Sequence, residues 1–356
     1  MTAPARQGGA VGRVALLALG GACLLAGLDA ALLLIGSAAP VRADHLPGAH
    51  GMIMVLGFLG TVIALERAQA LGRAWGYLAP AVLGAGGVAL ALGATLLGRL
   101  LLLEGCLLFV CLYVALYRRA PLPLVAVQVL SAVLATAAAS LWLVTDVAAL
   151  LPLLAGFIVL TIAAERAEMA QLSLGPRAAP RLVALAGALT ASALAAVLWP
   201  AVGTRPVGAI LLVVAGWLAR DDVGRRMIRT SGLRRYNGAA LLAGYVWLAV
   251  AGGTWLVAGP ATTQAVYDTV VHATFLGFGI SMVMAHAPII FPAVLGRPLP
   301  YRPVSWVPLV WLHVSLALRV AGNVTGSMLW QLGSIGTVTA VLLFLLTSIV
   351  LVVTAR

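Results

Sequence analysis

Long apolar stretches follow one another along the whole chain, separated by short polar or glycine- and proline-containing connections. A stretch of about 20 apolar residues is long enough to cross a bilayer as a helix. Twelve stretches approach this length, at residues 14–37, 49–71, 75–97, 100–117, 122–143, 147–170, 181–199, 205–219, 236–258, 265–292, 304–324 and 331–354. The pattern predicts an all-α polytopic membrane protein. The first stretch is interpreted as a retained helix. The stretch 205–219 is expected to form a short helix that is either tilted or paired with a thinner region.

The composition agrees with this architecture. Hydrophobic residues make up 63% of the 356 residues, charged residues make up 9%, and the mean hydropathy is +1.09. A soluble domain has about a quarter charged residues, so a soluble enzyme and a disordered chain are excluded. Cys23, Cys106 and Cys111 lie in apolar stretches without CxxC spacing and are interpreted as packing residues.

The distribution of positive charge predicts the orientation. All 22 basic residues are arginines, and most lie in short connections, so the net charge of +12 reflects the positive-inside rule and not nucleic-acid binding. With a cytoplasmic N-terminus, 18 arginines fall on the cytoplasmic side, and the outer side has four: Arg42, Arg99, Arg205 and Arg319. We expect a multi-pass protein of the bacterial inner membrane with both termini cytoplasmic.

An internal repeat divides the chain. Residues 57–68 read GFLGTVIALERA and residues 156–167 read GFIVLTIAAERA, with seven identities at a constant offset of 99. The tripeptide LGF occurs at 56–58 and again at 276–278. These segments lie on the second, sixth and tenth predicted helices. We therefore expect one integral membrane domain, residues 1–356, built from three pseudo-repeated four-helix units over roughly 1–119, 120–219 and 220–356.

Histidines are the main candidates for chemistry, because ionisable side chains inside a membrane are costly. His50 opens the second predicted helix and His272 lies near the start of the tenth, so both are expected in the outer half of the membrane. Two neutral imidazoles at one depth suit the axial positions of a haem iron, although an interfacial role for His50 stays open. Asp268 precedes His272 by one turn and is placed to accept its other ring N–H, or to act as an N-cap. His45 is interpreted as a solvated loop residue.

A second haem is a further candidate. His286 follows His272 on one helical face at a distance of about 21 Å along the axis, and His313 is the remaining histidine in the inner half. The alternative is that His286 and His313 bond to neighbouring helices. Arg319, near the outer end of the eleventh helix, is a candidate partner for a haem propionate, or a snorkelling arginine.

Other polar residues in the spans are weaker candidates. Two Glu–Arg pairs of the repeat are interpreted as contacts at helix ends: Glu66–Arg67 and Glu165–Arg166. Asp29 and Glu104 are candidates for proton relay or ligation. Four methionines on the two ligand helices suit copper(I) but are interpreted as packing residues: Met52, Met54, Met282 and Met284.

Two segments resemble a known family. HGMIMVLGF at 50–58 and HATFLGFGISMVMAHAP followed by GRPL, within 272–299, are similar to the histidine-bearing segments of the NnrS-type membrane proteins, with His50 and His272 at the matching histidines. The resemblance implies haem and copper and a link to nitric oxide metabolism. Twelve helices with histidines on the second and tenth also resemble the catalytic subunit of haem–copper oxidases, which implies a low-spin haem near the outer face.

The departures from these families concern copper. Met52 stands where the first family has a second histidine, and the sixth and seventh predicted helices, where the oxidases have copper ligands, contain no histidine. An oxidase-type copper centre is therefore not implied. What carries over is a b-type haem site and a redox role.

These observations predict an inner-membrane haem-binding protein in electron transfer or nitric oxide (nitrosative stress) handling, with catalysis as an oxidoreductase left open. The expected partners are the lipid bilayer, an electron donor such as a quinol or cytochrome, and a small gaseous ligand. The alternative is a secondary transporter whose buried His, Asp and Glu residues relay protons or cations. A scaffold protein is a weaker alternative. A Soret band in the purified protein would distinguish the haem-binding protein from the transporter.

Overall fold

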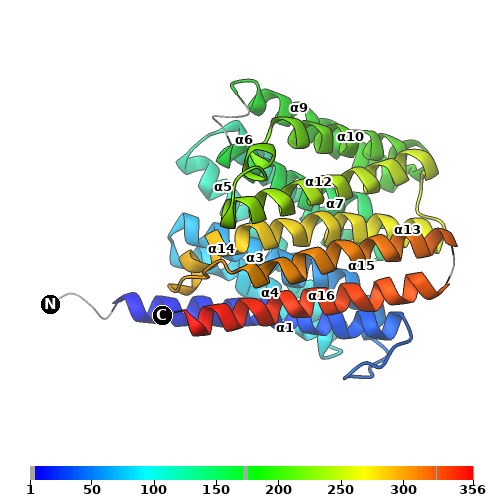
Figure 1. Ribbon diagram of the computed structural model, residues 1–356. Helices are drawn as coiled ribbons and strands as arrows, with labels where there is room; N and C mark the ends of the chain where they lie inside the picture. The colour runs from blue at the N-terminus through cyan, green and yellow to red at the C-terminus, as the bar shows by residue number, and fades with distance from the viewer. Residues whose placement is uncertain (1–4, 171–174, 326, 356) are drawn as a thin grey trace. The chain divides into compact units, whose positions relative to one another are not determined.

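The computed structural model describes residues 5–170, 175–325 and 327–355. These ranges are helical with no strand, and 12 of their helices are long and apolar enough to cross a membrane (Figure 1). The prediction of an all-α polytopic membrane protein is confirmed. The division into three pseudo-repeats stays a prediction.

The chain divides into two compact units, which we describe separately. Unit 1 comprises residues 1–121, 135–147 and 289–298, and unit 2 comprises residues 122–134, 148–288 and 299–356. The divisions fall inside two helices, α6 (Pro123–Leu141) and α14 (Ser281–Leu295).

Unit 1 is built around α4, which packs against α1, α5 and the continuous second span. Its elements are α1 (Ala5–Leu34), α2 (Leu46–Met52), η1 (Ile53–Gly60), α3 (Thr61–Leu71), η2 (Ala74–Tyr77), α4 (Leu78–Ala91) and α5 (Thr95–Arg119). The apolar pattern extends the third helix to residue 97, but α4 ends at Ala91. Gly93 adopts a left-handed φ of +83°, which turns the chain after the helix.

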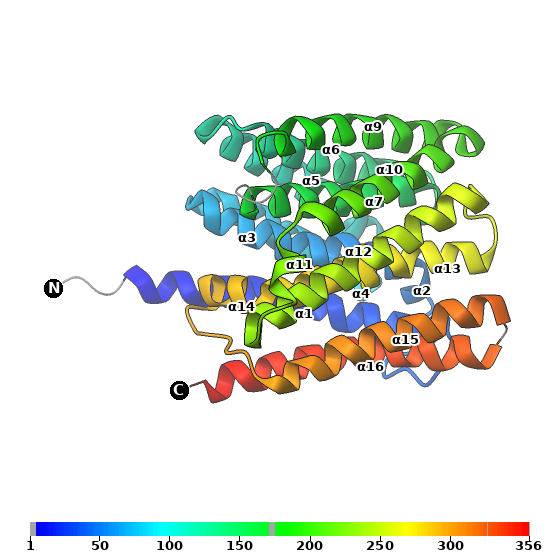
Figure 2. The ribbon, with the colours of Figure 1, turned by 45° about the horizontal axis from the view of Figure 1, so that its top comes forward.

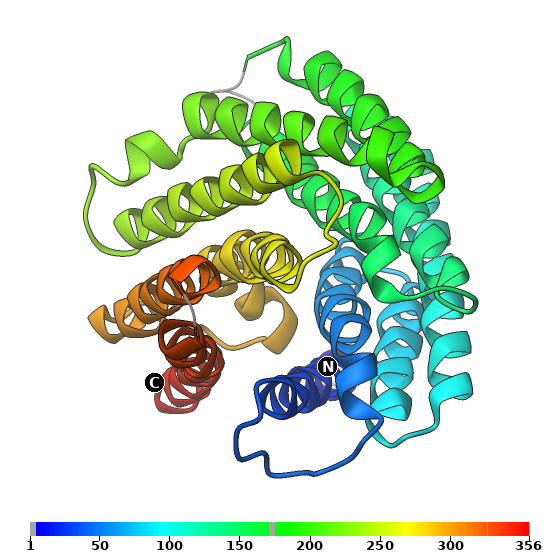
Figure 3. The same ribbon diagram turned by 90° about the vertical axis from the view of Figure 1, so that its right-hand side faces the viewer.

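Unit 2 contains most of the helices that follow α5. Its elements, besides parts of α6 and α14, are α7 (Val147–Met169), α9 (Ala178–Leu198), α10 (Pro200–Asp221), α11 (Gly224–Met227), α12 (Gly232–Ala258), α13 (Gln264–His272), η3 (Ala273–Ile280), η4 (Pro303–Ser305), α15 (Trp306–Thr325) and α16 (Ser327–Thr354). α15 and α16 lie side by side along their length (Figures 1 and 2). α10 packs against α9 and α12, and α13 packs against α12 and α15 (Figure 3).

The eighth span is longer than its apolar stretch. α10 has 22 residues and begins at Pro200, in the first turn, where the missing N–H of proline costs no helical hydrogen bond. Thr204 and Arg205 lower the local hydropathy without ending the helix. The expectation of a short eighth helix was therefore wrong.

Two spans share an unusual local structure. η1 and η3 are both π-helices of eight residues, and η3 begins 220 positions after η1, in register with the repeated LGF. π-helical turns are rare and frequent at functional sites. His50 lies three positions before the first residue of η1, and His272 lies one position before the first residue of η3. The two candidate ligand histidines therefore stand at matching local transitions in their helices.

Candidate functional site

His50 lies in unit 1 on α2, which has Pro47 in its first turn. Its Nδ1 is 2.9 Å from the backbone carbonyl oxygen of Gly27 in α1. A carbonyl oxygen only accepts, so Nδ1 carries the hydrogen, and in the neutral ring the lone pair is on Nε2. A neutral imidazole with its lone pair on Nε2 is a common metal ligand.

His272 lies in unit 2 at the end of α13. Thr263 is the N-cap of this helix and accepts a hydrogen bond from Val266 N at 3.3 Å, so Asp268 is not the cap. The Nδ1 of His272 donates to the backbone carbonyl of Asp268 at 2.8 Å and lies 3.2 Å from its carboxylate Oδ1. The lone pair of the neutral ring is again on Nε2. The expected contact between Asp268 and His272 is present.

The Asp268 carboxylate is 2% exposed and accepts hydrogen bonds from two further helices. Arg319 of α15 donates from Nε at 3.1 and 3.0 Å and from Nη2 at 2.5 Å. Asn323 donates from Nδ2 at 2.8 Å, and Trp330 of α16 donates from Nε1 at 3.2 Å. Buried charges are stable only when they are paired and hydrogen-bonded. This arrangement therefore holds Asp268, and through it His272, in one position.

Arg319 is buried beside Asp268, which differs from the snorkelling alternative. Its Nε and Nη2 are used by Asp268, whereas Nη1 makes no hydrogen bond within the residues that the structure describes. A contact between Nη1 and a haem propionate stays a prediction.

His286 and His313 have partners that use a ring lone pair. Nη1 of Arg166 lies 3.1 Å from Nε2 of His286, and because a guanidinium only donates, Nε2 accepts. Trp247 Nε1 donates to Nδ1 of His313 at 2.9 Å, so Nε2 of a neutral His313 carries the hydrogen. Ligation of iron by Nε2 of His286 would require the bond from Arg166 to break. Ligation by Nε2 of His313 would require the ring hydrogen to move to Nδ1, which would break the bond from Trp247. The second haem stays a prediction.

A second buried cluster surrounds Arg166, near the end of α7 that is predicted to be cytoplasmic. Arg166 binds the Asp222 carboxylate through Nε at 3.0 Å and Nη2 at 2.8 Å, and both side chains are almost fully buried. The hydroxyl of Tyr245 donates to Asp222, and Arg166 also donates to His286. Side chains from α7, from the C-cap of α10, from α12 and from α14 therefore meet at one buried bidentate ion pair.

The sequence indicated only part of these clusters. Asp268, Arg319 and His286 were candidates, whereas Asp222, Tyr245 and Asn323 were not. The available signal was the presence of polar side chains at the ends of apolar stretches. That signal does not reveal which helices pack together.

The remaining candidates lie outside the two buried clusters. Oδ1 of Asp29 accepts from Val41 N at 3.1 Å, which ties the loop after α1 to that helix. Glu104 is exposed on α5, and Nε2 of His45 donates to the carbonyl of Ala91 at 3.0 Å in an exposed position. The cysteines are free thiols, and those of Cys23 and Cys106 are buried in packing positions.

Metal sites built from clustered side chains are absent from the part of the chain that the structure describes, where no group of three or more His, Cys, Asp or Glu residues could hold an ion. A haem iron needs only axial ligands from the protein. A haem site with His50 and His272 as ligands stays a prediction.

Comparisons with protein families, curated proteins and solved structures place the chain in a family. No curated protein and no solved structure is significantly similar to this chain. The family described as "Domain of unknown function (DUF8744)" matches residues 13–353, which is nearly the whole length. The chain therefore belongs to the DUF8744 family.

Proposed function

We propose that this protein is a haem-binding redox protein of the bacterial inner membrane, in which His50 and His272 are axial ligands. The observation that carries the proposal is the tautomer of the two rings. Both donate from Nδ1 to a backbone carbonyl, so the lone pair of each neutral imidazole is on Nε2. His286 and His313 each use a lone pair in a bond to a neighbouring helix.

The groups around each histidine orient it. The carbonyl of Gly27 holds the ring of His50, and Asp268, fixed by Arg319, holds the ring of His272. Such outer partners set the ring orientation and raise the basicity of the ligand. Bound haem supplies a one-electron couple and an iron that binds small gaseous ligands. This chemistry suits electron transfer or nitric oxide handling.

The direct test is the haem content of the purified protein. Wild type is expected to show a Soret band, sharp reduced α and β bands and a b-type pyridine haemochrome. His50→Ala and His272→Ala are each expected to lose the low-spin spectrum. His45→Ala is the matched control, because that histidine lies in an exposed loop. Full retention of haem by both ligand variants at normal expression would contradict the proposal.

A second candidate function, a proton-coupled transporter, is supported by the Arg166 cluster. Ionisable groups buried in a membrane are typical of proton pathways, and Asp222 is paired inside unit 2 with Arg166 and Tyr245. A colourless wild type that carries protons across proteoliposome membranes, with loss of the flux in Asp222→Asn, would favour this candidate. Flux unchanged in Asp222→Asn would count against it.

A further inference from the structure

The connection from α10 to the first turn of α12 gathers positive charge. Asp221 and Asp222, at its start, each pair with an arginine of another helix. No acidic residue follows them over residues 223–235. Five arginines lie within 11 residues of this stretch, and all five side chains are exposed: Arg225, Arg226, Arg229, Arg234 and Arg235. We call these five arginines the basic segment.

Other arginines on the side predicted to be cytoplasmic have acceptors within the protein. Arg13 donates to the carbonyl of Val294 at 2.9 Å, and Arg119 donates to the carbonyl of Ala70 at 3.0 Å. The five guanidinium groups of the basic segment, by contrast, make no hydrogen bond or ion pair with the residues that the structure describes. The positive-inside rule accounts for the side on which these charges lie. It does not require that they lie together on one short segment without partners.

Packing against α12 fixes the backbone of the basic segment. α11 packs against α12 (Figure 2). A Cβ on Gly238 would lie 2.6 Å from the backbone nitrogen of Ile228, so the absence of a side chain at this position permits the close approach. Gly232, with a φ of +60°, turns the chain into α12. A ligand of the basic segment therefore meets an ordered backbone, which reduces the entropy lost on binding.

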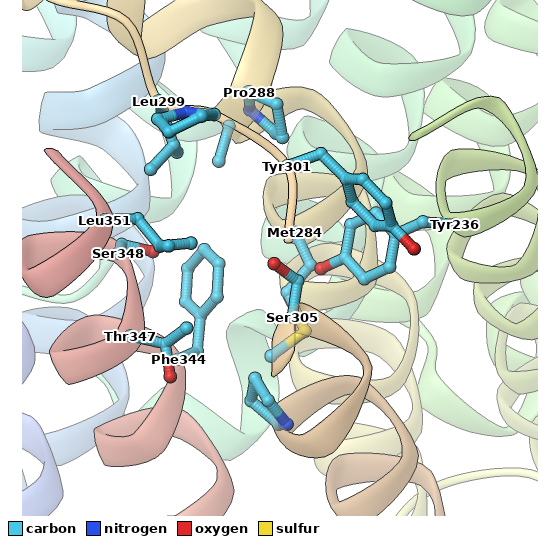
Figure 4. A pocket seen from close by; sticks show the side chains of 13 residues that line it. Tyr236, Met284, Pro288, Leu299, Tyr301, Ser305, Phe344, Thr347, Ser348 and Leu351 are labelled. Carbon is cyan, nitrogen blue, oxygen red and sulfur yellow. The ribbon is translucent and has the colours of Figure 1, made fainter. Parts of the chain in front are cut away.

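Two observations place the basic segment at the level of lipid head groups. It lies between the end of α10 and the first turn of α12, and both helices are long and apolar enough to span a membrane. Tyr236 directly follows Arg235. Its ring lies 5.7 Å from that of Trp306 and 5.9 Å from that of Tyr301, and Figure 4 shows Tyr236 beside Tyr301. Tyrosine and tryptophan are enriched at the membrane–water interface, which is also where lipid phosphates lie.

We propose that the basic segment binds the phosphate groups of anionic phospholipids in the adjacent leaflet. A guanidinium presents a planar fork of N–H donors that matches phosphate oxygens, and arginines next to a membrane span attract anionic lipids. Five positive charges exceed the charge of one phosphatidylglycerol molecule. The segment is therefore expected to bind several such molecules, or one lipid with two phosphate groups. This binding depends on neither haem nor transport.

The test is binding of fluorescently labelled phosphatidylglycerol to the full-length protein in micelles of a zwitterionic detergent. Arg225→Gln/Arg226→Gln is expected to weaken binding about 20-fold, because each arginine near an anionic surface contributes about fivefold. The matched control is Arg118→Gln/Arg177→Gln, which removes the same charge from two exposed arginines outside the basic segment. This control is expected to change the affinity by less than about twofold.

The lysine variant Arg225→Lys/Arg226→Lys keeps both charges and is expected to retain most of the affinity, which shows that the loss in the glutamine variant does not come from a changed fold. Equal weakening by the two glutamine double variants would overturn the proposal, because total charge and not the basic segment would then attract the lipid. Equal affinity of the wild type for labelled phosphatidylcholine would also overturn it. Displacement by inorganic phosphate as readily as by unlabelled phosphatidylglycerol would assign the segment to a soluble phosphate compound and overturn the lipid as ligand.

Discussion

The two copies of the sequence repeat, residues 57–68 and 156–167, have different surroundings. In unit 1, Arg67 contacts the adjacent Glu66 at 2.5 Å, and the two side chains are 13% and 24% exposed. In unit 2, Arg166 pairs with Asp222 at 2.8 Å, and the two side chains are 4% and 0% exposed. The shared sequence Glu-Arg-Ala, at 66–68 and 165–167, therefore places one arginine beside the adjacent glutamate and the other in an ion pair with a buried aspartate from a distant part of the chain.

The partners explain this difference. Asp222, Tyr245 and His286 are not part of the repeat, since the positions 99 residues earlier are Pro123, Asp146 and Gly187. A repeated sequence therefore preserves the helix and its charged end. The residues that pair with the arginine are contributed by neighbouring helices and are not repeated.

The largest expected effect is at Arg166. Arg166→Met leaves the Asp222 carboxylate buried without its partner and is expected to lower the free energy of unfolding by about 3–5 kcal/mol. Arg67→Met, the matched change in unit 1, is expected to cost less, because its partner Glu66 is 24% exposed whereas Asp222 is fully buried. Unfolding in detergent by increasing denaturant measures both. The double variant Arg166→Met/Asp222→Leu is expected to recover most of the loss, and equal losses in the two single variants would contradict the comparison.

A smaller difference is expected between the two π-helical segments. A Cβ on Gly277 would overlap the indole of Trp247 and come within 3.0 Å of Leu316, whereas a Cβ on Gly57 would come within 3.1 Å of the Gly87 Cα and 3.3 Å of Cys23 Sγ. Gly277→Ala is expected to destabilise by about 3 kcal/mol and Gly57→Ala by about 1 kcal/mol. Thermal unfolding of the two variants tests this order of destabilisation. A lower melting temperature for Gly57→Ala than for Gly277→Ala would contradict it.

The smallest difference is expected between two tyrosines. Tyr245 donates to the charged Asp222 in unit 2, and Tyr77 donates to the neutral Gln69 at 2.6 Å in unit 1. Removing the hydroxyl is expected to cost about 2 kcal/mol in Tyr245→Phe and about 1 kcal/mol in Tyr77→Phe. Denaturant midpoints measured side by side provide the check, and a larger loss in Tyr77→Phe would refute the assignment of Asp222 as a buried charge.

The histidines show which features of the candidate site the sequence pattern could predict and which it could not. The spans that contain His50, His272, His286 and His313 followed from hydropathy, and the contact of Asp268 with His272 followed from the four-residue spacing on a helix. The tautomers did not follow, because they depend on Gly27, Arg166 and Trp247, which come from other helices. The length of α10 was also predicted wrongly, because Thr204 and Arg205 interrupt the apolar pattern although the helix continues through them.

The sequence by itself determined that the described part of the chain forms 12 helices long and apolar enough to span a membrane, because a lipid environment requires apolar side chains and internally satisfied backbone groups. Tertiary structure alone decided which of the polar residues meet. Arg166 and Asp222 are 56 residues apart, and Asp268 and Trp330 are 62 apart, so only helix packing brings them within hydrogen-bonding distance. Hydropathy reports the preference of each segment for lipid and carries no information about the face that a neighbouring helix covers.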